Sequence, residues 1–301
     1  MNQLKKLFTI LLFACFIIAA DKSYKIVSTD IKSFIKQDGS IDFIEKREFD
    51  FTGSFSYVYQ DIPKRGFDQI YDIQVSANNV PFINSDTKDA GTFIIQEKNS
   101  FYRIYLYHKS QDEKKLFTVK YSLSQPFTVG PNDSQFYWIY LSDKWDKRPG
   151  SLAISQTFVS QISEKDITYQ LERPSSSKEY NLNIEGNTLS FMSDDFSSST
   201  EMKLRTIFPS SYFVNVKMND ENFSLAALEE KKRNKELVQY FIGFLALFSI
   251  VSFISYYRRN LKKFKLDIDE NQQFTSFPSD HHPVVINGLI YRELTLGPTG
   301  Y

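Results

Sequence analysis

The sequence predicts a mainly β protein: an antiparallel β-sandwich outside the membrane, followed by one long α-helix that forms a stalk and a transmembrane segment. Aromatic residues make up 16% of the 301 residues, with 28 Phe and 18 Tyr, and aromatic side chains favour strands. Short runs of alternating polarity are separated by turn signals, which is typical of a sandwich. No alternating βα pattern indicates a parallel sheet. One uncharged block is long enough to cross a bilayer.

The alternating runs place the strands between residues 21 and 222. From Ile41 to Phe51 the odd-numbered residues are mostly apolar and the even-numbered ones mostly charged, so one face is predicted to be buried. Residues 117–123 alternate in the same way, whereas Phe101–Tyr107 is aromatic on both faces, as in a central strand. Turn signals separate these runs: Asp38-Gly39, Asn78-Asn79, Asn99-Ser100, Gly130-Pro131-Asn132-Asp133 and Gly186-Asn187.

Residues 1–20 are predicted to be a cleaved signal peptide. Lys5 and Lys6 form a positive n-region, residues 7–18 form an uncharged h-region, and Ala19-Ala20 precede the expected cleavage site. A lipoprotein signal ending at Cys15 is the alternative, but Phe13 and the apolar residues after Cys15 do not suit one. Cys15 is the single cysteine, so the mature domain is expected to fold without a disulfide, on its hydrophobic core alone.

Residues 237–257 contain no charged residue and are predicted to form a transmembrane helix. Their 21 residues span about 31 Å at 1.5 Å per residue, close to the thickness of a hydrocarbon core. Basic residues flank both ends, so charge asymmetry alone does not orient the helix. The signal peptide orients the helix, because it directs residues 21–236 across the membrane. The basic flank and tail, residues 258–301, are then cytoplasmic.

A helix is expected to begin before the membrane. Ser224 is a suitable N-cap, and the following Leu225–Lys232 stretch is rich in good helix formers. Residues 223–236 are therefore predicted to be a stalk helix that continues through the membrane to about Lys265, and the β-sandwich is expected to occupy residues 21–222.

The formal net charge is zero. Because phosphate neutralisation supplies most nucleic-acid affinity, a balanced charge argues against a nucleic-acid partner. The expected partners are the lipid bilayer and an unidentified envelope protein or glycan.

Three segments resemble the YciQ-like predicted membrane proteins, the family called domain of unknown function 2207. They are Asp38–Pro63 with its Phe-x-Gly-x-Phe and Ile-Pro pattern, the aromatic run Asp133–Trp145, and Phe277–Glu293 after the helix. The resemblance implies a bacterial envelope protein with an exported β domain and a membrane-embedded C-terminal part, and it brings no established activity. Longer members continue into further hydrophobic helices, so this chain is either a fragment or a shortened member.

No catalytic, cofactor-binding or metal-binding residue is predicted, and no cofactor is expected. Common hydrolase, metalloprotease and nucleotide-binding motifs are missing from the sequence. A Ser-His-Asp triad in the exported domain would have to use His108, which is interpreted as a solvent-facing rim residue. His281-His282 lack a further ligand at the usual spacing and are interpreted as a polar turn before Pro283.

Carboxylates and aromatics offer two further candidates. Glu45 is placed on the inward face with Arg47, where a structural ion pair is favoured over a general acid. Three aspartates lie near predicted loop positions, with Trp138 and Trp145 close in sequence: Asp61, Asp143 and Asp146. Carboxylates with aromatics can form a carbohydrate-binding surface, but these residues are interpreted as ordinary parts of strand ends and cores. A cluster of five aromatic residues is interpreted as core rather than as a surface patch: Phe49, Phe51, Phe55, Tyr57 and Tyr59.

These observations favour a membrane-anchored cell-envelope protein that binds or organises a partner outside the membrane. The alternative is an envelope-polymer hydrolase that uses paired carboxylates, such as Glu45 and one of the loop aspartates. A cleft with two carboxyl groups about 5 to 10 Å apart would favour the hydrolase.

Overall fold

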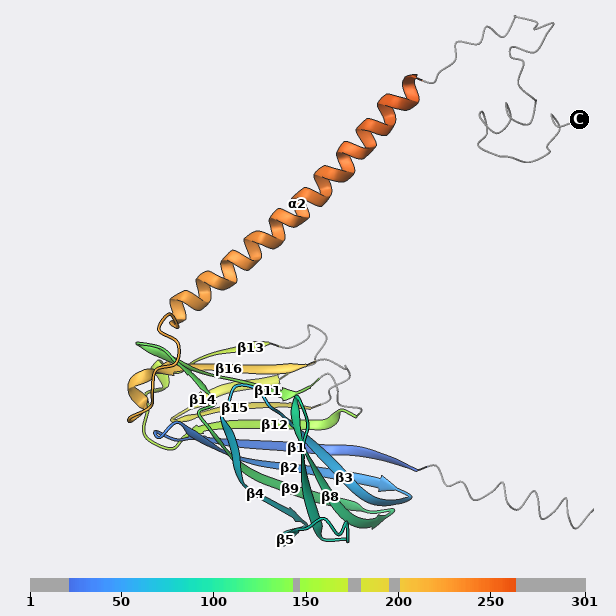
Figure 1. Ribbon diagram of the computed structural model, residues 1–301, viewed down its shortest axis with the longest axis vertical. Coiled ribbons are helices and arrows are strands. Elements are labelled where there is room, and N and C mark those ends of the chain that lie inside the picture. The colour runs from blue at the N-terminus through green and yellow to red at the C-terminus, as the bar shows by residue number, and fades with distance from the viewer. Residues whose placement is uncertain (1–21, 143–146, 173–179, 195–200, 264–301) are drawn as a thin grey trace, which may run out of the picture. The chain divides into compact units, whose positions relative to one another are not determined.

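The computed structural model describes residues 22–142, 147–172, 180–194 and 201–263. Within these ranges the chain is mostly strand and ends in one long helix, which confirms the predicted fold class. The signal peptide at residues 1–20 and the tail after Lys263, with His281-His282, lie outside the described residues. The part of the chain that holds the strands, from Ser23 to Pro209, is called the β domain. Figure 1 shows its sheets.

The described strands form one large sheet and two small ones. The eight-stranded sheet has the order β14-β15-β12-β1-β2-β9-β4-β5. Its strands, in that order, are Tyr180–Glu185, Thr188–Asp194, Pro149–Phe158, Ser23–Ile35, Ser40–Thr52, Lys114–Ser124, Gln69–Ala77 and Val80–Pro81.

Each small sheet has four strands. One has the order β10-β11-β16-β13, with bounds Phe127–Val129, Asp133–Leu141, Met202–Pro209 and Thr168–Glu172. The other has the order β3-β8-β7-β6, with bounds Ser54–Pro63, Phe101–Gln111, Thr92–Glu97 and Ile83–Asn84. Two short 3-10 helices, Glu164–Asp166 and Ser210–Tyr212, complete the β domain.

Both small sheets pack against the same face of the large sheet. On β2 the odd-numbered residues face inward, and the ring of Phe43 lies 5.3 Å from the ring of Trp138 on β11. Further along the same face, Phe51 contacts His108 on β8, with ring centroids 5.3 Å apart. The side chains between the layers form one aromatic-rich core, so the alternation in Ile41–Phe51 correctly predicted the buried face.

The strand pairing is not purely antiparallel, contrary to the expectation from the sequence. β1 pairs antiparallel with β2 but parallel with β12, where Ile31 is opposite Ile154. Ser33 Oγ also donates a hydrogen bond to the carbonyl oxygen of Ser155, 122 positions away. The short strands β6 and β7 are parallel as well. The sequence pattern did not show this because β1 and β12 are connected through the strands β2–β11 and not through a helix, so no βα alternation accompanies the parallel pair.

Local chemistry explains the first hairpin. Gly39 has a φ of +79°, a conformation that glycine adopts without steric cost. The side chain of Asp38 accepts hydrogen bonds from both the N–H and the hydroxyl of Ser40, at 2.9 and 2.6 Å. The predicted Asp38-Gly39 turn therefore connects β1 to β2.

The segment before the helix is hydrogen-bonded to β10 through Asn219. Asn219 donates from its side chain to the carbonyl of Phe127, accepts from the N–H of Val129, and donates from its own backbone to the Val129 carbonyl. The helix α2, Leu225–Lys263, then begins at the predicted N-cap. Ser224 Oγ accepts from the N–H of Ala227 at 3.1 Å, which satisfies one free donor of the first turn.

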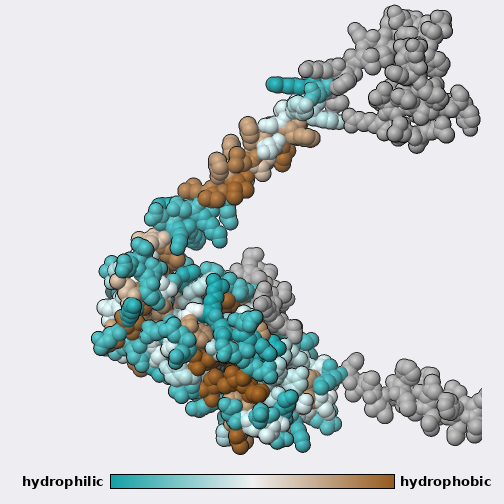
Figure 2. All heavy atoms as spheres, viewed as in Figure 1, coloured by the Kyte–Doolittle hydropathy of each residue, from teal (hydrophilic) through white to brown (hydrophobic). Residues whose placement is uncertain are grey.

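One helix in the described chain, Leu225–Asn260 within α2, is long and apolar enough to cross a membrane. Its large apolar side chains between Leu237 and Tyr257 are exposed. Figure 2 shows them as a hydrophobic band with hydrophilic segments at both ends of the helix.

Candidate functional site

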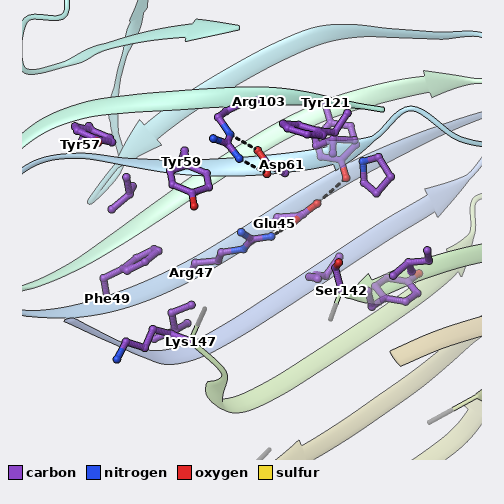
Figure 3. Close-up of a pocket in the computed structure, with 18 of the residues that line it drawn as sticks. Glu45, Arg47, Phe49, Tyr57, Tyr59, Asp61, Arg103, Tyr121, Ser142 and Lys147 are labelled. Carbon is purple, nitrogen blue, oxygen red and sulfur yellow. Dashed lines mark hydrogen bonds and ion pairs between the residues drawn. The ribbon is translucent and has the colours of Figure 1, made fainter. Parts of the chain in front are cut away.

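A cavity of about 890 Å³ opens in the β domain where β2, β3 and β11 approach one another. Glu45 and Arg47 of β2 line it from the large sheet, and β3 lines it with the run Phe55–Tyr59 and with Asp61. Trp138, Ile139 and Tyr140 contribute from β11. Figure 3 shows Glu45 and Arg47 on one strand and Tyr59 and Asp61 on another, with Ser142 from the end of β11 and Lys147 from the start of β12.

Glu45 and Arg47 form the ion pair predicted from the sequence. Arg47 Nη2 donates to Glu45 Oε2 at 2.8 Å, and the Tyr121 hydroxyl donates to Glu45 Oε1 at 2.6 Å. Only 5% of Glu45 is exposed. Burial, and then the charge of Glu45, raises the pKa of Tyr121 far above its usual value. Tyr121 therefore stays a proton donor to the carboxylate.

Asp61 and Arg103 form a second ion pair in the same cavity. Arg103 Nε and Nη2 donate to the two carboxylate oxygens of Asp61, each at 2.7 Å, in the bidentate geometry that favours arginine. The guanidinium also lies 4.1 Å from the ring centroid of Tyr59. The hydrogen bonds to Asp61 raise the pKa of Arg103. Asp61 lies two residues before the end of β3, in agreement with its interpretation as part of a strand end.

The cavity therefore brings together the two carboxylates that the hydrolase alternative requires, Glu45 and Asp61. All four of their oxygens already accept hydrogen bonds from Arg47, Tyr121 or Arg103. Both carboxylates are thus parts of hydrogen-bonded ion pairs in the walls of the cavity. The other aspartates of that alternative, Asp143 and Asp146, lie outside the described residues, as does Trp145.

The lining carries more positive than negative charge. Glu201, the third acidic residue, pairs with Lys203. Six basic residues line the cavity: Lys22, Arg47, Lys64, Arg65, Arg103 and Lys147. In the described ranges, no carboxylate lies within ion-pair distance of Lys22, Arg65 or Lys147. The cavity is thus suited to an anionic ligand.

Four tyrosines on the outer face of the β3–β8 pair extend the lining onto the surface. Tyr57 lies opposite Tyr107 and Tyr59 opposite Tyr105, with ring centroids about 6 Å apart within each pair. Tyr57 is 48% exposed and Tyr59 is 43% exposed. The core interpretation of the aromatic cluster holds for Phe49 and Phe51 and is wrong for Tyr57 and Tyr59.

The reason is that the chain changes sheets at Gly53, whose φ is +82°, between β2 and β3. Phe55 still packs on Phe51, at 4.8 Å between ring centroids. Further along β3 the buried residues are the even-numbered Gln60 and Ile62, so Tyr57 and Tyr59 face outward. The register shift near Phe55 sets one residue of β3 against two of β8, so it leaves the alternation of β3 unchanged. The tyrosine pairs were missed because the inward face of β2 was continued into β3.

The prediction that His108 is a solvent-facing rim residue is also wrong. It is 3% exposed and packs between Phe51 and Phe117, with ring centroids 5.3 and 4.9 Å away. Its Nδ1 lies 2.8 Å from Ser110 Oγ, and its Nε2 has no hydrogen-bond partner among the described atoms. Burial, helped by nearby Lys115, lowers the pKa of His108 to about 4. It is a neutral core residue at neutral pH.

Similarity to solved structures is low. The chain is similar to a candidate nutrient-binding protein of Legionella pneumophila at 13% identity and a TM-score of 0.37, covering 62% of this chain and 67% of that one. It is similar to an M1 zinc metallopeptidase from Deinococcus radiodurans at 7% identity and a TM-score of 0.33, covering 60% of this chain and 42% of the peptidase. A comparison with curated proteins finds no match.

The comparison with protein families gives a clear result. Residues 25–208 match the N-terminal domain of the predicted membrane proteins called domain of unknown function 2207. The match covers almost all the strands of the β domain and more than half of the chain. This chain therefore belongs to the family of predicted membrane proteins with a domain of unknown function 2207.

Proposed function

We propose that this chain is a single-span protein of the bacterial cell envelope whose β domain lies outside the membrane and binds an anionic partner in the cavity. The observation that carries the proposal is the charge of the lining, in which Lys22, Arg65 and Lys147 have no carboxylate within ion-pair distance among the described residues. Arginine and tyrosine side chains at the cavity are also the types enriched at binding interfaces.

A binding role fits the cavity better than the hydrolase alternative. A glycosidase needs one carboxyl group to protonate the leaving group and a second one to act as nucleophile or base. Here Glu45 and Asp61 are each held by an arginine, and Glu45 also accepts a hydrogen bond from Tyr121. Such an arrangement stabilises the walls of the cavity. The other basic side chains of the lining can then bind a ligand.

Charge reversal at the cavity tests the binding role. We expect the full chain, in detergent micelles, to bind fluorescent poly-glutamate, and R65E combined with K147E to weaken binding by about tenfold or more at low salt. The matched control is K165E combined with K217E, which reverses two exposed lysines that do not line the cavity. Because exposed charges are screened within about 8 Å at 0.15 M salt, the difference should shrink as salt is added. Equal loss in the control and the cavity variant would contradict the proposal.

Orientation is tested by protease accessibility in intact cells, with any outer membrane permeabilised. The signal peptide proposed for residues 1–20 predicts that residues 21–236 are digested from outside while a tag placed after Tyr301 stays protected. The opposite pattern, a protected β domain and a cleaved tag, would move the binding partner to the cytoplasm.

A further inference from the structure

Exposed tyrosine rings border the cavity. Tyr57 and Tyr59 line it, and each residue is close to half exposed. Tyr105 and Tyr107 lie beside them on the paired strand β8, and their rings are stacked with centroids 6.2 Å apart. These four residues are called the tyrosine surface. Because exposed clusters of large aromatic side chains commonly mark interaction sites, the tyrosine surface extends the candidate site beyond the cavity.

Arg103 holds one end of the tyrosine surface in place. Its guanidinium lies 4.1 Å from the ring centroid of Tyr59 and 5.1 Å from that of Phe101. The same guanidinium donates to both carboxylate oxygens of Asp61. Tyr59 therefore rests against a side chain that is itself fixed by an ion pair. A ring that is held in position before a ligand arrives lowers the entropy cost of binding.

Positive charge lies across the cavity from the tyrosines. Figure 3 shows Lys147 on the opposite side of the drawn lining from Tyr59. Lys22 and Arg65 line the cavity as well. Among the described residues, no carboxylate lies within ion-pair distance of any of these basic side chains. A ligand that meets both features has anionic groups beside flat apolar faces.

A second cavity, of about 510 Å³, adjoins the first. The two share four lining residues: Pro63, Arg65, Trp138 and Ile139. The second cavity is also lined by β10 and by the connection between β9 and β10. Together the two exceed the range of about 300 to 1,000 Å³ that is typical of a pocket for one small molecule. Adjoining cavities of this size are suited to an elongated ligand.

From these observations we propose that the anionic partner is a linear acidic polysaccharide. Its sugar rings pack on Tyr57 and Tyr59, and its acidic groups pair with Lys22, Arg65 and Lys147. This inference rests on the proposed function and names the class of ligand. A sugar ring has an apolar C–H face that packs on an aromatic ring and hydroxyl groups that hydrogen-bond around its rim. The lining offers aromatic rings and polar side chains together.

An anionic lipid fits the cavity less well. The ion pairs Glu45–Arg47 and Asp61–Arg103 lie in its walls. An acyl chain beside them would remove water from charged groups, which is unfavourable. An acidic peptide would meet the same basic side chains without presenting sugar rings, so poly-glutamate is the comparison that isolates the contribution of charge.

The probe is a fluorescein-labelled hexasaccharide of galacturonic acid, titrated into the full chain in detergent micelles. Three comparison ligands each lack one feature: the methyl ester of the hexasaccharide lacks charge, the disaccharide lacks length, and poly-glutamate lacks sugar rings. We expect the hexasaccharide to bind at low salt. The methyl ester and the disaccharide should bind about tenfold more weakly or worse, because one loses the ion pairs and the other cannot extend beyond the cavity.

Removal of the rings distinguishes a polysaccharide site from a general polyanion site. Y57T combined with Y59T removes both rings and keeps residue types that favour strands. Y57F combined with Y59F keeps the rings and removes only the hydroxyl groups. We expect the threonine pair to weaken hexasaccharide binding about tenfold, because truncation of an interface tyrosine commonly costs more than about 1 kcal/mol. Poly-glutamate binding should be nearly unchanged, and the phenylalanine pair should keep most of the affinity for the hexasaccharide.

The matched control is Y71T combined with Y169T, which removes two exposed tyrosines that line neither cavity. It should leave hexasaccharide binding unchanged. Circular dichroism shows whether the sheets of each variant are intact. If the threonine pair at Tyr57 and Tyr59 does not fold, the comparison of the four ligands on the unmodified chain provides the test.

The outcomes separate this inference from the proposed function. Equal affinity for the hexasaccharide and the disaccharide, or an equal loss of hexasaccharide and poly-glutamate binding in the threonine pair, would overturn the polysaccharide. Poly-glutamate binding without hexasaccharide binding would also overturn it and leave the anion site standing. In that case, displacement of poly-glutamate by phosphatidylglycerol added to the micelles would assign the cavity to a lipid headgroup. If neither the hexasaccharide nor poly-glutamate binds, both proposals fail.

Discussion

Acidification from pH 7 to pH 5 is expected to destabilise the β domain by about 2 kcal/mol through the buried side chain of His108. Its ring lies between Phe51 and Phe117, and its Nε2 has no partner among the described atoms. An imidazolium there would carry a buried charge and an unpaired N–H, which is unfavourable. The charged groups near it are Lys115, which disfavours protonation, and Glu113, which favours it.

The magnitude follows from the two pKa values. The pKa of His108 is about 4 in the folded chain, against 6.5 for a free histidine. Between these values the unfolded chain binds more protons than the folded chain, so the free energy of unfolding falls as the pH falls. At about 1.36 kcal/mol per pKa unit the full loss is about 3 kcal/mol, and about 2 kcal/mol of it occurs between pH 7 and pH 5.

Urea unfolding of the full chain in detergent, followed by tryptophan fluorescence at pH 7 and pH 5, measures the effect. The comparison is with H108Q, whose amide can still bond to Ser110 and does not titrate in this range. His281 and His282 are present in both proteins, so their contribution cancels. We expect the pH-dependent loss to be smaller in H108Q by about 2 kcal/mol. The same loss in both proteins would refute the placement of a neutral histidine in the core.

Two further substitutions test the packing around the cavity and the start of the helix. Y121F should lower the free energy of unfolding by about 1–3 kcal/mol, because buried Glu45 loses a hydrogen bond, and a change near zero in urea titrations would contradict the structure. G130A should lower it by about 1–3 kcal/mol, because the added methyl group would lie 2.1 Å from the Phe223 carbonyl oxygen, whereas G243A meets open space and should leave the urea midpoint of the β domain unchanged. Equal midpoints for G130A and G243A would show that the close approach is absent.

Alternation and turn chemistry were sufficient to predict much of the fold. They identified the buried face of β2 and the Glu45–Arg47 pair, because the period of two continues unbroken along that strand. Ser224 was identified as the N-cap from residue type alone, and its hydroxyl does bond to the first turn of α2. Each of these features depends on residues within a few positions of one another.

The features that were missed depend on pairing between distant segments. Tyr57 and Tyr59 lie on the surface because β3 leaves the large sheet and pairs with β8 instead, and this pairing depends on a segment about 45 residues away. His108 follows an aromatic run and looked like a strand end, yet β8 continues to Gln111 beneath β2. The meeting of Asp61 with Glu45 in one cavity arises from how separate sheets pack, which the spacing of residues does not encode.

The position of β1 has a consequence for how the chain acquires its structure. β1 is a central strand of the large sheet, with β2 on one side and β12 on the other. The hairpin with β2 can form locally, but the other edge of β1 pairs with β12, which lies more than a hundred residues later in the chain. Such high contact order slows folding, since the entropy of closing a long loop is lost before its contacts form. During that interval β1 exposes an unpaired edge, and such edges make folding intermediates prone to aggregation.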